Sequence, residues 1–188
     1  QFRFPETSIG IYPGLGGTQR TARICGLECS RYAVLAGNFL DSVTAHDLGL
    51  LTHNVDPSEI DALVGSLAGT KPENKYPNEP INLHSNVVSF AREFYSDANI
   101  EDLLAGEVPE DFDSNNPLVS RQLKSLSRAA PIALRIANEL LSEASTGKSL
   151  ESGLNLELER LGEIFGTKDA EEGLSALIEG RRPKYNST

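Results

Sequence analysis

The 188-residue sequence contains no methionine, no tryptophan and only two cysteines. Two cysteines are too few for a disulfide framework. No apolar run approaches the ~20 residues that a membrane helix needs, so we expect no membrane span. Because the sequence starts at Gln1 and not at a methionine, we expect it to be a piece of a longer protein. Any N-terminal targeting signal would then lie outside it.

Basic side chains are also scarce. The 17 Lys and Arg residues stand against 27 Asp and Glu residues, which gives a formal net charge of -10. Such an acidic chain repels phosphate backbones and anionic lipids, so we expect neither a nucleic-acid nor a membrane partner. The hydrophobic fraction of 39% and the charged fraction of 23% are those of a globular protein.

Hydrophobic periodicity predicts a mostly helical chain. Two short stretches, 2–9 and 50–55, are the expected strands. Residues 69–80 hold three prolines among polar residues, which is typical of a linker. We therefore divide the chain into a core segment (1–69), a helical insertion or linker (70–117) and a C-terminal helical region (118–188). The ranges predicted to be helical are 18–24, 27–36, 42–48, 57–67, 81–95, 99–104, 133–144, 150–165 and 170–178.

The segment between Phe4 and Arg20 carries the strongest chemical signal. Glu6 lies at the end of the expected first strand, and the glycine-dense loop 10–17 follows and leads into a helix start at Thr18. Glycines let the backbone approach a ligand closely, and a helix start offers unpaired N–H groups and partial positive charge. A carboxylate in such a place serves as a general acid or base when burial raises its pKa. On spacing alone, a solvated glutamate before a tight turn is the favoured interpretation.

Residues 5–20, PETSIGIYPGLGGTQR, resemble the signature of the enoyl-CoA hydratase/isomerase (crotonase) family. Residues 35–37 (LAG) and 45–50 (AHDLGL), and the C-terminal run 165–185, are similar to further segments of that family. The resemblance covers about residues 1–68 and 118–185. It implies an α/β crotonase-like fold, of which this chain would be the mostly helical C-terminal portion.

The resemblance also implies a coenzyme A thioester as substrate, with no cofactor and no metal. Glu6 is then the catalytic acid/base at the α-carbon, and two backbone N–H groups hold the enolate oxygen. Those groups and the second glutamate of hydratases would lie upstream of Gln1. We therefore expect a 2-enoyl-CoA hydratase of the fatty-acid β-oxidation type, which adds water syn across a trans-2-enoyl-CoA. An enoyl-CoA isomerase of the same family is the alternative.

Two further family branches bear on this expectation. The 3-hydroxyisobutyryl-CoA hydrolase branch has an insertion similar to 70–117, but it carries an Asp where this chain has Gly14. Because glycine supplies no acid or base, Gly14 disfavours a hydrolase. Bifunctional β-oxidation proteins join a crotonase module to a 3-hydroxyacyl-CoA dehydrogenase, and a chain without its own start is compatible with that origin.

The resemblance implies substrate or coenzyme A contacts for six residues. The basic ones among them would contact phosphates, although a basic tail is equally a solvated helix end. These six residues are Gly14, Gly16, Gly17, Phe165, Arg182 and Lys184.

The resemblance further implies a homo-oligomer, a trimer or a multiple of it, because the family's C-terminal helices build trimers. An inert oligomerisation or docking module is the alternative from another functional class. We expect a cytoplasmic location.

The remaining reactive side chains are expected to be structural. Cys25 and Cys29 form a C-x3-C pair without further Cys or His at zinc spacing, so we expect buried thiols and no metal site. His46, His53 and His84 are not paired with a nucleophile in any recognisable spacing.

Overall fold

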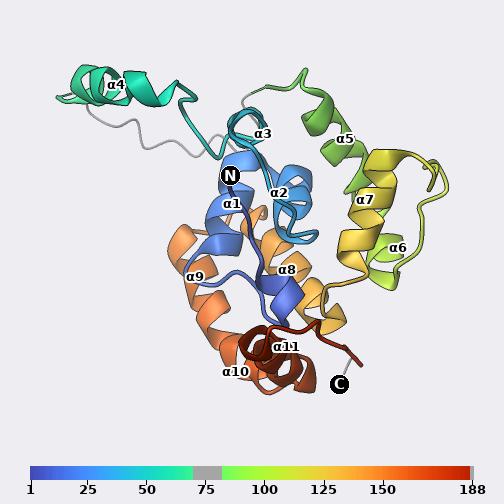
Figure 1. Ribbon diagram of the computed structural model, residues 1–188. Coiled ribbons are helices and arrows are strands. Elements are labelled where there is room, and N and C mark those ends of the chain that lie inside the picture. Colours follow the sequence, from blue (N-terminus) through green and yellow to red (C-terminus); the bar gives the residue numbers. More distant parts are fainter. Residues whose placement is uncertain (70–81, 187–188) are drawn as a thin grey trace.

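Residues 1–69 and 82–186 are described in the computed structural model, and they form a helical assembly around α1 and α8 (Figure 1). Every range predicted to be helical contains a helix, although the range 150–165 is divided into two at Arg160. In chain order the elements are η1 (Glu6–Ile9), α1 (Gly17–Cys25), α2 (Leu27–Val34), α3 (Ser42–Asp47), η2 (Pro57–Glu59), α4 (Ile60–Leu67), α5 (Asn86–Phe94), α6 (Ile100–Ala105), α7 (Pro117–Leu126), α8 (Pro131–Ala144), α9 (Leu150–Glu159), α10 (Leu161–Phe165) and α11 (Lys168–Glu179).

The two strand predictions, at 2–9 and 50–55, are wrong. Residues 6–9 form the 3-10 helix η1, and 50–55 are irregular. Among the described residues the one β pairing is an antiparallel bridge between Phe2 and Leu40, with both N–H···O distances at 2.9 Å. A strand needs a hydrogen-bonded neighbour along its length, and Pro5 has no N–H to offer one. The described part of the chain therefore contains helices and no strand.

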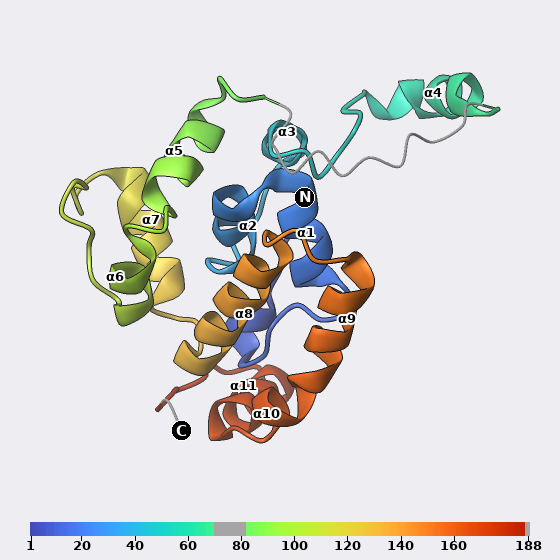
Figure 2. The ribbon, with the colours of Figure 1, turned by 180° about the vertical axis from the view of Figure 1, so that it is seen from behind.

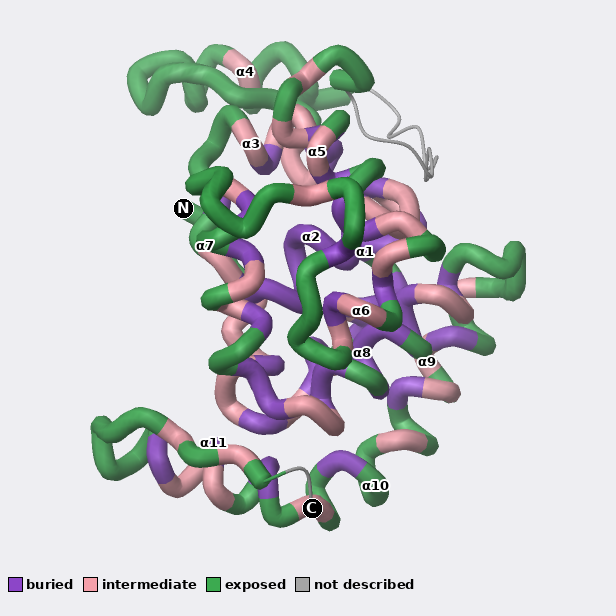
Figure 3. Tube along the Cα trace, turned by 90° about the vertical axis from the view of Figure 1, so that its right-hand side faces the viewer, coloured by how far each residue is buried: buried purple, intermediate pink, exposed green. Residues whose placement is uncertain are grey.

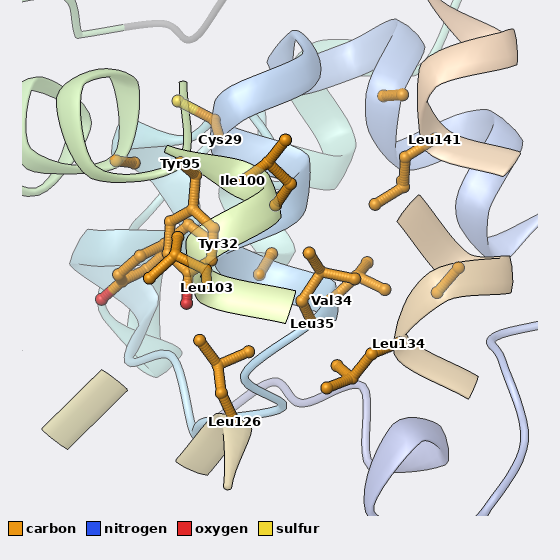
Figure 4. Close-up of a cluster of buried hydrophobic side chains, with 14 of the residues drawn as sticks. Cys29, Tyr32, Val34, Leu35, Tyr95, Ile100, Leu103, Leu126, Leu134 and Leu141 are labelled. Carbon is orange, nitrogen blue, oxygen red and sulfur yellow. The ribbon is translucent and has the colours of Figure 1, made fainter. Parts of the chain in front are cut away.

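The core lies where α2 and α8 meet α5, α6 and α7 (Figure 4). The labelled side chains there are at most 7% exposed. Helix α8 supplies the predicted apolar face at the 3.6-residue period, with Ala133, Ile136 and Leu140 all buried. The labelled side chains are Cys29, Tyr32, Val34, Leu35, Tyr95, Ile100, Leu103, Leu126, Leu134 and Leu141.

The part of the expected insertion that the structure describes, 82–117, packs on the body (Figure 2). Its helices α5 and α6 add Phe94 and Leu103 to the core. Arg31, 2% exposed, joins α2 to the end of α5, since it donates to the Tyr95 carbonyl at 3.0 Å and pairs with Asp97 at 2.8 Å. Residues 70–81 lie outside the described residues, and the three segment boundaries stay predictions.

Two surfaces remain uncovered. Helix α4 projects from the body and has no buried residue (Figures 1 and 3). The predicted helical range 150–165 is also partly uncovered, since Leu158 is 63% exposed and Phe165 is 54% exposed, while Leu150 and Leu154 are half-buried. The buried face of α9 instead carries Gly153 and Glu157. A Cβ on Gly153 would overlap the Gln19 side chain, so the absence of a side chain is what lets α9 lie against α1 on this face. No helix in 1–69 or 82–186 combines the length and apolarity needed to cross a bilayer.

Candidate active site

Glu6 is the first residue of η1, and the body holds this element from two sides. The Thr7 carbonyl accepts a hydrogen bond from the Ala130 N–H, just before α8, at 2.9 Å. Thr7 is 1% exposed, and its hydroxyl donates a hydrogen bond to the Leu35 carbonyl, at the end of α2, at 3.1 Å. The backbone that carries Glu6 is therefore fixed by two core helices.

The Glu6 carboxylate is not used for structure. Its Oε2 atom is buried and has no hydrogen-bond partner in the described part of the chain. Desolvation raises the pKa of Glu6, and its own backbone N–H and the charge of Arg3 oppose this only in part. A carboxyl group with one oxygen left without a partner and a raised pKa is suited to exchange a proton with a bound substrate.

The glycine loop follows Glu6 and is tightly shaped. Gly16 has φ 87°, and Leu15 has φ 56° with a fully exposed side chain. A Cβ on Gly17 would lie 2.7 Å from the Pro13 Cβ. Gly14 differs, since a Cβ there would meet nothing within 4 Å. The geometry thus requires glycine at 16 and 17, and the expected substrate contacts of all three glycines stay predictions.

The expectation of unpaired N–H groups at the start of α1 is wrong. The buried Glu157 of α9 accepts from the Gly16 N–H at 2.6 Å, the Thr18 hydroxyl at 2.5 Å and the Gln19 N–H at 3.3 Å. The Gly17 N–H donates to the Gly14 carbonyl at 2.9 Å. A protein carboxylate therefore already accepts hydrogen bonds at the start of this helix.

Sequence reasoning missed Glu157. The sequence pattern that could have identified it is the spacing of Gly153 and Glu157, which lie four residues apart and therefore on the same face of α9. The Glu157 carbonyl also accepts from the Tyr12 hydroxyl at 2.5 Å, and burial, followed by the Glu157 charge, raises the pKa of Tyr12 to about 12.

Helix α11 and the tail that follows it pack against η1. The Tyr185 hydroxyl donates to the Ser8 carbonyl at 2.8 Å, and burial raises the pKa of this tyrosine to about 12. Gly173 of α11 lies directly against the backbone of Ile9. The C-terminal helix is therefore a support for the element that carries Glu6.

The basic tail holds one cation in ion pairs and two that line cavities. Arg181 pairs with Glu172 and Glu179 at 2.5 Å each, and its hydrogen bonds lower the pKa of Glu172 to about 2. Arg182 and Lys184 are exposed and line cavities. Arg182 shares a cavity of about 440 Å³ with Ser8, Arg128 and Tyr185, so it lies near η1. Lys184 lines a neighbouring cavity of about 610 Å³ with Lys168 and Arg182.

Phe165 lies elsewhere, at the end of α10, and lines neither of these two cavities. The structure thus brings Arg182 and Lys184 together near η1, and it does not bring Phe165 into either of their cavities.

The two cysteines are free and buried, as predicted. Burial raises the pKa of Cys25 and of Cys29, the latter to about 12, so both stay protonated thiols. In residues 1–69 and 82–186 no group of three or more His, Cys, Asp or Glu side chains is arranged to hold a metal ion.

Known proteins match this chain along its whole length. The family model described as "Enoyl-CoA hydratase/isomerase" matches residues 1–188. A probable mitochondrial enoyl-CoA hydratase 2 of Arabidopsis thaliana is 23% identical over 184 residues, covering 98% of this chain and 42% of that protein. A mitochondrial 3-hydroxyisobutyryl-CoA hydrolase of Xenopus laevis is 25% identical over 193 residues, covering 94% of this chain and 48% of that protein.

The fold has a solved counterpart. The crystal structure of an enoyl-CoA hydratase from Rhodobacter sphaeroides 2.4.1 superposes with a TM-score of 0.72 at 23% identity, covering 97% of this chain and 53% of that chain. This likeness shows a crotonase-like fold. The chain spans about half the length of the curated relatives it matches. On the full-length match of the family model, the chain belongs to the enoyl-CoA hydratase/isomerase family.

Proposed function

We propose that the protein is a 2-enoyl-CoA hydratase in which Glu6 is the acid/base at the α-carbon of the substrate. The observation that carries this proposal is the half-buried carboxylate of Glu6, which has one oxygen without a partner and a raised pKa. A structural carboxylate at such a place would be expected to have hydrogen bonds to both oxygens. A carboxylate that transfers a proton must keep one oxygen accessible to the substrate.

The reaction assigns Glu6 a single proton transfer. Water forms the new C–O bond at the β-carbon, and the π electrons of the double bond move toward the thioester carbonyl. The protonated Glu6 carboxyl then delivers its proton to the α-carbon on the same face, and the water gives its proton to the group that activates it. Exchange with solvent then returns both groups to their starting protonation states. Desolvation, by raising the pKa of Glu6, increases the fraction that holds this proton near neutral pH. We assign the activation of water to a group outside this chain.

Hydrolysis of a 3-hydroxyacyl-CoA is the second candidate, because a relative carries the name of a 3-hydroxyisobutyryl-CoA hydrolase. Gly14 argues against it, since this position has open space and no side chain to orient or activate water. Double-bond isomerisation is the third candidate, and the family description includes it. It requires only that a carboxylate such as Glu6 move a proton between two carbons.

One assay of the full-length protein separates the three activities. Crotonyl-CoA hydration is followed by the loss of the conjugated enoyl thioester absorbance, hydrolysis of 3-hydroxyisobutyryl-CoA by the release of free thiol, and isomerisation by the conversion of a trans-3-enoyl-CoA. We expect hydration to be the fastest by at least about tenfold, a margin equal to 1.4 kcal/mol in activation free energy. Thiol release without hydration would refute the proposal in favour of the hydrolase.

The assembly and the location of the protein are also proposals. The outward apolar side chains of α9 to α11, including Leu158, Phe165 and Ile178, support a homo-oligomer that covers them. A cytoplasmic location stays a prediction, since the names of the Arabidopsis and Xenopus relatives say that those proteins are mitochondrial.

A further inference from the structure

We propose that Glu157 is a positioning residue, whose buried carboxylate fixes the glycine loop 13–17 beside Glu6. Its effect on catalysis rests on the proposed function, whereas its effect on the loop does not. Glu157 comes from α9, about 140 residues after the loop in the sequence, and it is 3% exposed. It is not a catalytic residue, because burial and its own hydrogen bonds keep its oxygens from a substrate.

Glu157 holds the loop at both ends. At the near end its carbonyl accepts from the Tyr12 hydroxyl at 2.5 Å. At the far end Oε2 accepts from the Gly16 N–H at 2.6 Å, and Oε1 accepts from the Thr18 hydroxyl at 2.5 Å. Helix α1 has no side-chain cap from its own N-terminal residues, so this remote carboxylate acts as its cap and complements the helix dipole.

The loop needs such an anchor because its own conformation is unfavourable. Leu15 has φ 56°, a left-handed value that a leucine rarely adopts. Its side chain is 101% exposed, so packing does not offset the strain. Strained backbone of this kind persists only where surrounding contacts determine it. Two backbone hydrogen bonds close the turn locally, from the Gly17 N–H to the Gly14 carbonyl and from the Thr18 N–H to the Pro13 carbonyl. The hydrogen bonds from Gly16 and Thr18 to Glu157 add the contacts that tie this turn to α9.

A shift of the loop would reach Glu6. The Ile11 N–H donates to the Glu6 carbonyl at 3.1 Å, one residue before Tyr12. On the other side, a Cβ added to Gly17 would lie 3.9 Å from the ring of Phe4, two residues before Glu6, so the loop passes close to this ring. Loss of the Glu157 anchor should therefore move the catalytic carboxylate as well as the loop.

The test compares Glu157→Gln with Glu159→Gln in the full-length protein. Glu159 is an exposed residue at the end of the same helix, so its variant matches the change in charge and size. In Glu157→Gln an NH2 group replaces one acceptor oxygen and faces a donor, so one hydrogen bond becomes a repulsive contact. We expect kcat for crotonyl-CoA to fall by about 10- to 10²-fold at a temperature where the variant is folded. Glu159→Gln should keep the wild-type kcat.

Hydrogen exchange supplies a measurement that is independent of activity. Amides in the peptide that spans residues 13–19 should exchange faster in Glu157→Gln, while amides of α8 keep their wild-type rates. If Glu157→Gln does not fold, Thr18→Val takes its place, with Thr18→Ser as the conservative variant that restores the hydroxyl. Unchanged exchange in 13–19, or a kcat equal to wild type, would overturn the proposal. If the wild-type protein hydrates no enoyl-CoA, the proposed function fails, and the exchange measurement still decides whether Glu157 anchors the loop.

Discussion

Replacing Gly173 with alanine should destabilise the protein even though alanine favours a helix. Gly173 lies inside α11, where propensity alone would stabilise the alanine variant by about 1 kcal/mol. The new Cβ, however, would overlap the Ile9 carbonyl group and lie 2.8 Å from the Tyr185 hydroxyl oxygen. Because the Ile9 atoms are backbone, they cannot rotate away. An overpacking cost of about 3 kcal/mol, less the gain in propensity, leaves a net loss of about 2 kcal/mol in the free energy of unfolding.

Gly162 in α10 provides the matched control, since a Cβ there would meet nothing within 4 Å. Gly162→Ala should therefore gain up to about 1 kcal/mol, and the two variants should differ by about 3 kcal/mol. Denaturant unfolding of the full-length protein measures this difference. Gly173→Ala should also lower kcat, because Ile9 belongs to η1, which carries Glu6. Equal stabilities of the two variants would refute the close packing of α11 against η1.

Three further predictions concern charge, assembly and pH. Reversing Arg182 and Lys184 to Glu should raise KM for acyl-CoA more than it lowers kcat, and the rise in KM should shrink with added salt. The control is Lys124→Glu, which alters an exposed residue. A KM equal to wild type at all salt concentrations would leave Arg182 and Lys184 without a role in binding. The isolated 188-residue chain should show no hydratase turnover and should self-associate through the apolar faces of α9 to α11. A clean monomer in light scattering, or measurable turnover, would contradict the account. Burial raises the pKa of Glu6, so the stability that it contributes is present at acid pH and lost as the pH rises through its folded pKa. Glu6→Gln should therefore raise Tm relative to wild type more at neutral than at acid pH, and a Tm difference that is equal at both would refute the desolvation of Glu6.

Most of the helices could be predicted because their signals are local, although α7 (Pro117–Leu126) was not among the predicted ranges. Helix α8 repeats its apolar residues every three or four positions, and α11 ends at Gly180, which has φ 66°. Burial of Cys25 and Cys29 was predicted from a different argument, the lack of further Cys or His residues at zinc spacing. The two strands were predicted wrongly because β pairing depends on neighbours that a local pattern does not contain. Within the described residues, Phe2 finds a single partner, Leu40.

The site could be predicted only where its residues are adjacent in the sequence. The neighbourhood of Glu6 and the glycine loop was visible in the order of residues 5–20. The carboxylate of Glu157 was not, because it approaches the loop from about 140 residues away. Which face of α9 turns inward also depended on a tertiary contact, that of Gly153 with Gln19. The leucine periodicity pointed to a face that includes Leu158, which is exposed.

The central claim is that Glu6 delivers the proton to the α-carbon, and deuterium incorporation tests it most directly. The full-length protein, its Glu6→Gln variant and the control Glu110→Gln, which alters an exposed residue, are each given crotonyl-CoA in D2O. The wild-type protein and the control should place deuterium at the α-carbon of the 3-hydroxyacyl product. In Glu6→Gln the rate of this incorporation should fall by at least about 10²-fold, because the amide has no transferable proton. Incorporation by Glu6→Gln at a near-normal rate would contradict the account.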